Sequence, residues 1–297
     1  MTGSPTAGLA IVVSTIGRAE SFRRLVASVA ASDPGAALEL VVVDQSSDQR
    51  CRQVLVEGQW SLRWKATTSG LGASRGRNTG LRWTEAPLVA FPDDDAWYPP
   101  ATLRRVQEAF DADPGLAGLC GRQLTSDGRS SMLRWQETAG PVSRWNFLRT
   151  SIMSTMFFRR SWLARVGDFD EGMGVGSPGW YGACEESDLL LRVLEAGGRV
   201  HYDPTLVVLQ EEPRDDPDDR FVAKMLSYGC GQGRLWRKRR LPLGLLAWYL
   251  ARKVAAATVR GATGQRVVAR ADLAWVRGNI AGLLDRPPRE LAARAAS

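Results

Sequence analysis

The 297 residues are 44% hydrophobic and 24% charged, so the chain is long enough to bury a large core and lacks the composition of a disordered protein. Its four cysteines have no paired spacing, which argues against a disulfide framework or a zinc knuckle and fits a reducing cytosol. The net charge of +7 comes from one part of the chain, because the stretch 220–271 holds 12 Lys or Arg residues and no Asp or Glu. No apolar run approaches the length of a membrane span.

The first half of the chain alternates apolar runs with a helical pattern. Residues 9–13 lack the preceding basic region of a signal peptide and are predicted to form a first strand. A helical stretch over 20–31 and a second apolar run over 38–43 follow. Strands separated by a helix of this length predict βαβ units, and therefore an α/β fold with a mostly parallel, Rossmann-like sheet and helices on both faces. Ligands of such sheets bind at the carboxyl ends of the strands.

A third apolar run, 88–91, is followed by Asp93, Asp94 and Asp95. Three adjacent like charges at a strand end repel one another, and a hard divalent cation with its oxygen ligands would offset that cost. The triplet therefore indicates a metal and nucleotide site. A solvated acidic loop that caps the helix predicted over 101–110 is the alternative interpretation.

The segment 70–80 is rich in glycine and carries two arginines, Arg75 and Arg77. Glycines let the backbone approach a ligand closely, and guanidinium groups suit phosphate or a base edge. The segment has neither the Walker pattern nor a Gly-x-Gly-x-x-Gly after the first strand. We interpret it as a ligand-binding loop, with a purely structural turn as the alternative.

Carboxylates gather again at the start of a helix predicted from Cys184 to a stop at Gly197 and Gly198. Glu185 and Asp188 are three residues apart and share a face, whereas Glu186 points elsewhere. Capping of the helix dipole is the alternative interpretation. Most tryptophans of the middle region are expected in the core, but Trp180 lies in a glycine-rich loop where its ring could face a sugar. His201, the only histidine, is interpreted as structural.

The C-terminal part begins with a cluster of Lys and Arg at 234–240, which precedes an apolar run over 241–250 that contains Trp248 and Tyr249. We predict a domain over 1–233 and a basic, partly amphipathic helical extension over 234–297. The segment 234–253 suits an anionic membrane surface, such as the inner face of the plasma membrane around a cytoplasmic protein. A helix packed on the rest of the chain with solvated arginines is the alternative, and no nucleic-acid partner is expected.

Taken in order, these segments resemble the family-2 inverting glycosyltransferases of the GT-A fold over about residues 9–233. The resemblance implies contacts to a nucleotide-diphosphate sugar from Ser14, Thr15, Arg18, Asp44, Gly72, Arg75, Arg77, Asn78, Asp93 and Asp94. It implies Mn²⁺ or Mg²⁺ bound by Asp93 and Asp95, the latter as principal ligand, and Glu186 as catalytic base. The acceptor, a glycan or a lipid-linked molecule, is expected near Trp180, Glu185 and Asp188.

Two positions depart from the family pattern. Glu186 stands where many relatives have Asp, which resembles a bacterial subgroup with a Glu-Glu motif. Residues 208–211 contain no His where many relatives place a further metal ligand, so Gln210 and Glu211 are the candidates.

The implied function is transfer of a sugar to an acceptor hydroxyl in cell-surface polysaccharide or glycolipid synthesis. A nucleotidyltransferase is one alternative, although glycines and an Arg would be expected directly after its first strand, and Ser14–Arg18 lacks those glycines. A non-catalytic nucleotide-sugar-binding protein of the same fold is the other.

Overall fold

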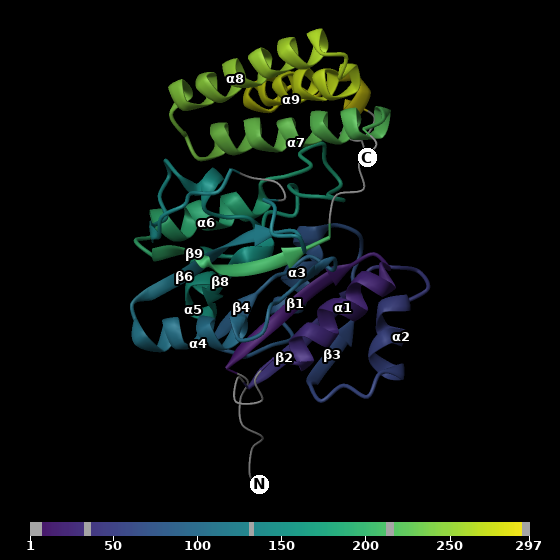
Figure 1. Ribbon diagram of the computed structural model, residues 1–297, viewed down its shortest axis with the longest axis vertical. Helices are drawn as coiled ribbons and strands as arrows, with labels where there is room; N and C mark the ends of the chain where they lie inside the picture. The colour runs from purple at the N-terminus through teal and green to yellow at the C-terminus, as the bar shows by residue number, and fades with distance from the viewer. Residues whose placement is uncertain (1–7, 33–36, 131–133, 212–216, 293–297) are drawn as a thin grey trace. The chain divides into compact units, whose positions relative to one another are not determined.

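The computed structural model describes residues 8–32, 37–130, 134–211 and 217–292 (Figure 1). The chain forms two compact units. The first takes residues 1–71, 75–169 and 189–213, and the second takes residues 72–74, 170–188 and 214–297. The division falls within helices α3 (Ala73–Leu81) and α6 (Glu185–Glu195).

The first unit is built around a nine-stranded sheet in the order β3-β2-β1-β4-β8-β6-β9-β5, with β7 paired to β9. The strands are β1 (Leu9–Thr15), β2 (Leu38–Asp44), β3 (Arg63–Thr67), β4 (Leu88–Ala90), β5 (Ala96–Trp97), β6 (Leu116–Leu124), β7 (Gly140–Pro141), β8 (Met156–Arg159) and β9 (Arg199–Gln210). The first four in this order are parallel. β8 is antiparallel to β4 and to β6, so β6 and β9 run in the direction of β1, whereas β5, β7 and β8 run opposite. The predicted mostly parallel sheet is confirmed.

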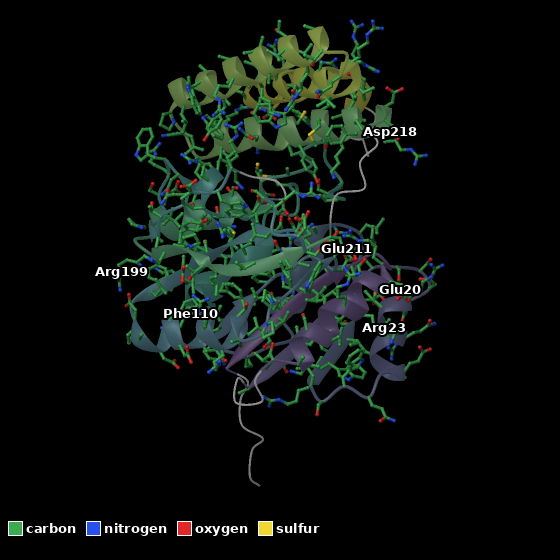
Figure 2. The ribbon with its side chains drawn as sticks, in the orientation of Figure 1. Glu20, Arg23, Phe110, Arg199, Glu211 and Asp218 are labelled. Atoms are coloured by element: carbon green, nitrogen blue, oxygen red, sulfur yellow. The ribbon has the colours of Figure 1, made fainter. Side chains whose placement is uncertain are left out.

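Helices cover both faces of this sheet. They are α1 (Ala19–Ala30), α2 (Arg50–Glu57), α3, α4 (Thr102–Ala112) and α5 (Arg160–Val166), with 3₁₀ turns η2 (Phe147–Arg149) and η3 (Met153–Thr155). Ile11 and Val13 of β1 belong to one core cluster with Phe22 of α1. Side chains alternate along a strand, so Val12 faces the other way, toward α3. Glu20 and Arg23 on α1 are exposed (Figure 2).

Most of the glycine-rich segment 70–80 is helical and not a loop, because residues 73–81 form α3 and only residues 70–72 precede it. Gly76 and Gly80 are four residues apart and lie on one helix face. A Cβ at Gly76 would come within 3.0 Å of Ser14, and one at Gly80 within 3.0 Å of Val12. The glycines therefore let α3 approach β1 closely, a packing role that the sequence interpretation did not assign to them.

The second unit contains three long helices, α7 (Asp219–Lys238), α8 (Leu243–Ala262) and α9 (Arg266–Leu284), followed by the turn η4 (Arg289–Leu291). α7 begins after Asp218, whose carboxylate accepts a hydrogen bond of 2.8 Å from the Phe221 amide. The predicted helical extension is confirmed, but the boundary expected between residues 233 and 234 falls inside α7. The acidic segment 211–219 lies partly outside the described residues, and Asp219 is already helical.

Glycines bring α7 and α9 together. Gly229 and Gly233 on α7 face Gly278 and Gly282 on α9. At each of the four, an added Cβ would lie under 3.0 Å from backbone of the facing helix. Small residues four apart allow such a close approach of two helix backbones. Bulk on this interface would force the helices apart.

Gly233→Ala is expected to lower the free energy of unfolding by about 1–3 kcal/mol, because its methyl group would overlap the Asn279 carbonyl of α9. Gly261→Ala on α8 is the matched control, since nothing lies within 4 Å of its Cβ position. The control should raise stability by up to about 1 kcal/mol through helix propensity. Urea unfolding of both variants measures the difference, and equal effects would contradict the close packing of α7 on α9.

Candidate active site

The carboxyl edge of the parallel strands gathers the first group of predicted site residues within the first unit. Thr15 at the end of β1 is paired in register with Asp44 at the end of β2. The Thr15 hydroxyl donates a hydrogen bond of 2.5 Å to Asp94, which follows β4. The prediction that these strand ends meet at one edge is therefore confirmed.

Arginines balance the charge of the aspartate triplet. Arg18 forms ion pairs with both Asp94 and Asp95, and Arg77 pairs with Asp93 at 3.2 Å. Asp94 is 2% exposed, and this burial raises the pKa of its carboxyl above the ordinary value even though Arg18 and Thr15 act in the opposite direction. Two guanidinium groups therefore offset the repulsion among three adjacent carboxylates.

Asp95 is also held by a row of amide side chains. The Gln210 amide donates to Asp95 at 3.2 Å, and Gln123 donates to Gln210 and, at 2.7 Å, to Ser154. These contacts fix the plane of the Asp95 carboxylate. The sequence indicated Gln210 as a candidate but not Gln123, because no local pattern marks a buried amide whose partners are 31 and 87 residues away.

The donor set at this edge suits a particular kind of metal binding. Among the described residues, no group of three or more His, Cys, Asp or Glu side chains is arranged to hold a metal ion. Mg²⁺ in nucleotide enzymes takes one or two carboxylates and completes its shell with phosphate oxygens and water. Asp95, which is the more exposed of the two Arg18-paired carboxylates, fits such a role. The residues therefore fit a cation whose coordination shell is completed by phosphate oxygens and water.

Asp44 organises the loop after β2. Its carboxylate accepts hydrogen bonds from the Ser46 amide at 3.0 Å, the Ser46 hydroxyl at 2.5 Å and the Arg52 amide at 3.1 Å. It is almost completely buried. Ser14 lies nearby in the fold and donates to the Gln45 side chain at 3.2 Å. Contacts of Ser14 and Asp44 to a base or ribose stay a prediction.

The basic residues of α3 divide into exposed and buried side chains. Arg75 is exposed, whereas Arg77 is buried and lies 5.8 Å from the centre of the Phe169 ring. Asn78 is also buried and bonds the backbone of Phe169 twice, at 2.9 and 3.0 Å. Gly72 belongs to the second unit and has a φ of +121°, which favours glycine. Nucleotide contacts from these four residues stay predictions.

In the second unit, α6 begins with a cluster of carboxylates. Cys184, directly before it, has a φ of +71°, an uncommon conformation for a residue with a side chain. Glu185 and Asp188 are buried, and Glu186 is half-buried. A Cβ at Gly174, where φ is +99°, would lie 2.8 Å from the Glu185 carboxyl carbon, so glycine makes room for Glu185. Glu186 is the member of this cluster that solvent reaches most readily.

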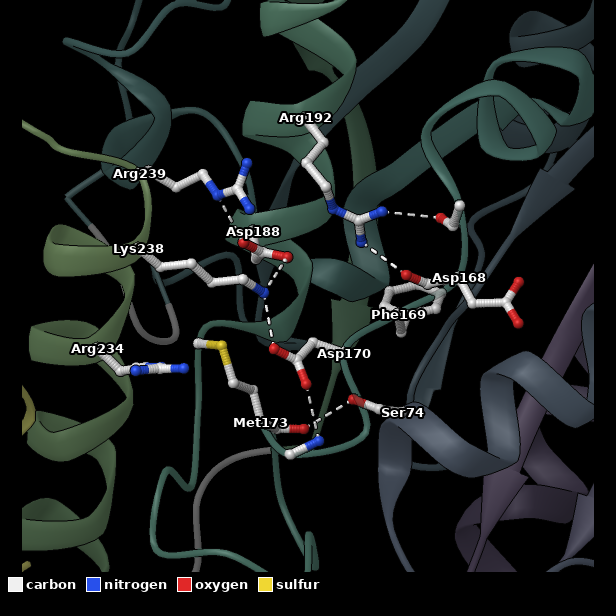
Figure 3. Close-up of polar contacts among 12 residues, drawn as sticks. Ser74, Asp168, Phe169, Asp170, Met173, Asp188, Arg192, Arg234, Lys238 and Arg239 are labelled. Carbon is white, nitrogen blue, oxygen red and sulfur yellow. Dashed lines mark hydrogen bonds and ion pairs between the residues drawn. The ribbon is translucent and has the colours of Figure 1, made fainter. Parts of the chain in front are cut away.

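Asp188 is an anchor for the end of α7. The side chain is 0% exposed and pairs with Lys238 at 3.0 Å and with Arg239 at 2.8 Å. Lys238 also pairs with Asp170 at 2.7 Å, so one ammonium group bridges two carboxylates (Figure 3). The sequence grouped Asp188 with the acceptor residues. Its contacts within this unit are structural, and an acceptor role stays a prediction.

Trp180 packs into a small core of the second unit. It is 6% exposed and lies in a cluster with Leu226 and Cys230 of α7 and Ala274 of α9. The neighbouring Tyr181 donates a hydrogen bond to Asp285. This burial favours the core position expected for most of the tryptophans, and contact of Trp180 with a sugar stays a prediction.

Two solved structures are similar to this chain in fold. The mannosyltransferase PcManGT from Pyrobaculum calidifontis, solved with GDP-Man and Mn²⁺, has a TM-score of 0.62 and 17% identity over 96% of this chain and 89% of its own. S. aureus TarS 1–349, solved with UDP-GlcNAc, has a TM-score of 0.59 and 15% identity over 95% of this chain and 93% of its own. At these identities the likeness establishes the GT-A fold, as predicted.

Sequence relatives lead to the family. The pre-mycofactocin glycosyltransferase of Mycobacterium tuberculosis is 25% identical over 230 residues, which are 74% of this chain and 45% of the relative. The chain thus spans about half the length of the curated relatives that it matches. Residues 10–167, just over half of the chain, match the family described as Glycosyl transferase family 2. The chain therefore belongs to glycosyl transferase family 2, as the order of its motifs predicted.

Proposed function

We propose that this chain is an inverting glycosyltransferase that moves a sugar from a nucleoside-diphosphate sugar to an acceptor hydroxyl. The observation that carries the proposal is the charge-balanced aspartate edge, where Arg18 and Arg77 pair with Asp93, Asp94 and Asp95. Such an edge suits a ligand that brings both phosphate anions and a cation. Family membership and relatives solved with UDP-GlcNAc or GDP-Man support the same class of donor.

The residues of the edge would bind and orient the donor. Guanidinium groups form planar, charge-assisted hydrogen bonds to phosphate, so Arg18, which is half exposed, can exchange its carboxylate partners for the diphosphate. Asp95, oriented by Gln210, would hold a divalent cation. When bound, Mn²⁺ or Mg²⁺ supplies a Lewis acid that lowers the cost of negative charge on the departing nucleoside diphosphate.

Glu186 would act as the general base. Its carboxylate accepts the proton of the acceptor hydroxyl while the hydroxyl oxygen bonds the anomeric carbon, and the bond from that carbon to the diphosphate breaks with its electron pair. One displacement inverts the anomeric centre. The half-buried position of Glu186, beside buried Glu185 and Asp188, is what favours it for this role.

Binding of UDP, GDP, CDP and dTDP, each with and without Mn²⁺, tests the donor site by thermal shift. One nucleotide should raise the melting temperature in the presence of Mn²⁺, since a ligand at 100 times its Kd stabilises the native state by about 2.7 kcal/mol. Asp95→Ala should remove this shift. Asp111→Ala, an exposed aspartate on α4, is the control and should retain it. If no nucleotide raised the melting temperature of the wild-type chain, the assignment of the aspartate edge as the donor site would be overturned.

Glu186→Gln should reduce transfer by about 10²–10⁴-fold and leave the nucleotide-dependent thermal shift unchanged, because the amide cannot accept the proton. Glu195→Gln, at the exposed end of the same helix, is the matched control and should retain turnover. Near-normal turnover of Glu186→Gln would place the base elsewhere. A wild-type chain that binds a nucleotide but transfers from no nucleotide sugar would instead be a binding protein.

Lys238→Met should lower stability by about 1–3 kcal/mol, the usual loss for a hydrogen bond to a charged group, with Arg239 still paired to Asp188. Lys224→Met, on an exposed turn of the same helix, is the control and should change stability by less than about 0.5 kcal/mol.

The loss caused by Lys238→Met should depend on pH. Burial alone would raise the pKa of Asp170, but hydrogen bonds from Lys238 and the Gly172 amide lower it overall. A folded-state pKa below the unfolded value of about 3.9 gives stabilisation that is complete above that value and is lost as pH falls through the folded pKa. The difference in the free energy of unfolding between Lys238→Met and wild type should therefore become smaller in acid. A difference that widened in acid would contradict the Asp170–Lys238 pair.

A further inference from the structure

Two of the three charged residues of helix α8 lie on its inner side. Lys253 and Arg260 are seven residues apart, two helical turns, and therefore share a face. Both pair with Asp272 of α9, Lys253 at a distance of 2.7 Å, and Asp272 is only 4% exposed. Leu246 and Ala257, the buried residues of α8, lie on the same inner side.

The opposite side of α8 is apolar and exposed. We define the α8 outer face as its exposed residues: Leu243, Gly244, Ala247, Trp248, Ala251, Arg252, Val254, Ala255, Thr258, Val259, Gly261 and Ala262. Its four large apolar side chains are 62% (Leu243), 51% (Trp248), 43% (Val254) and 63% (Val259) exposed. A helix that faces water shows the reverse pattern, polar outside and apolar inside. Such a continuous face, unlike scattered exposed residues, marks an interaction surface.

The contacts beneath α8 also resemble packing in an apolar solvent. α7 and α9 meet through glycines, and the side-chain NH₂ of the fully buried Asn279 of α9 donates a hydrogen bond of 3.0 Å to the Trp275 carbonyl. Small residues at helix contacts and paired polar groups inside are typical of helices in lipid. None of the helices in the described ranges is both long and apolar enough to cross a bilayer. A helix of this kind can instead lie in the membrane interface.

Charge on the α8 outer face favours an anionic partner. No Asp or Glu occurs from residue 220 to residue 271, and the one charged residue of the face is Arg252, placed 4.5 Å from the ring centre of Trp248. A symmetric contact between two copies would set this face against itself and bring like charges together. Anionic lipid attracts the same cations, and Trp with Arg is a combination common at the membrane interface.

We propose that the α8 outer face docks the chain on an anionic lipid surface. This relocates the membrane-binding segment that the sequence placed at 234–253. Arg234 and Arg237 share Asp285, and Lys238 and Arg239 pair with Asp170 and Asp188, so three carboxylates of the second unit offset most of the charge of these four residues. The face on α8 extends to Ala262 and takes its affinity from apolar side chains as well as from charge.

Vesicle sedimentation of the full chain tests this proposal. Wild type should bind vesicles that contain phosphatidylglycerol more tightly than vesicles of phosphatidylcholine alone, and added salt should weaken the binding. Trp248→Glu with Val259→Glu should reduce binding by at least about tenfold, since both changes remove buried apolar area and add repulsion. Arg252→Ala alone should reduce it about fivefold. Val56→Glu, an equally exposed valine on α2, is the matched control and should bind as wild type does.

Thermal unfolding of each variant checks that the fold is kept, which the exposure of the substituted side chains favours. Absence of vesicle binding by wild type, or equal binding by Val56→Glu and the Trp248→Glu, Val259→Glu variant, would overturn the proposal. Sedimentation velocity identifies the competing occupant. A wild-type dimer that both Glu substitutions abolish would assign the face to a second copy of the chain. None of these outcomes depends on the nucleotide site, which the thermal shift measures separately.

Discussion

Like charge at one sheet edge is the constraint on which the first unit depends. The parallel strands deliver their carboxyl ends to the same edge, and the segment after β4 adds three adjacent aspartates there. Asp94 is buried, and an isolated buried carboxylate is costly, while Asp93 and Asp95 add like charge beside it, so the triplet needs cationic and hydrogen-bonding partners. Arg18 comes from the turn before α1, Arg77 from α3 and Gln210 from the end of β9. The positions of the turn before α1, of α3 and of the end of β9 therefore depend on the charge of the aspartate triplet.

The two arginine partners of the aspartate triplet differ in how readily they can leave their carboxylates. Arg18 is half exposed, whereas its partner Asp94 is buried and also accepts a hydrogen bond from Thr15. The guanidinium can therefore turn toward a phosphate group, and a cation that arrives with the phosphate would replace its charge beside the carboxylates. Arg77 is buried beside Phe169 and has less freedom to exchange. Within one acidic edge, the exposed arginine is suited to respond to a ligand and the buried arginine to preserve the scaffold.

The sequence predicted those features that depend on local pattern. Apolar runs located β1, β2 and β4, and the rule that parallel strands end at one edge brought Thr15 and Asp94 together. The interpretation of the sequence failed for α3, because glycine is a poor helix former and the segment 70–80 resembles a loop. The four-residue spacing of Gly76 and Gly80 was the available signal, since it places both on one helix face.

Features that depend on distant partners could not be predicted. The environment of Gln123 depends on residues 31 and 87 positions away in the sequence, and that of Asp188 depends on a residue 50 positions away. The inverted polarity of α8 could be predicted from the sequence only in part. Its alternation of apolar and basic residues was visible, but which side faced inward depended on Asp272, whose burial only the fold reveals. The sequence therefore predicted membrane affinity in this region, whereas the exposed apolar surface begins after the basic cluster and extends further along the chain.

Asp188 explains why no structural boundary separates residues 219–233 from the basic cluster after them. A boundary after residue 233 would part Lys238 and Arg239 from the helix that carries them to the carboxylate that they neutralise. Asp188 has no exposure to water, and a buried charge that loses its partners destabilises a fold by several kcal/mol. The same ion pairs join the end of α7 to the first turn of α6, two residues after Glu186. Lys238 and Arg239, which the sequence interpretation assigned to a separate extension, therefore belong to the charge balance of the second unit, and the acidic start of α6 depends on them.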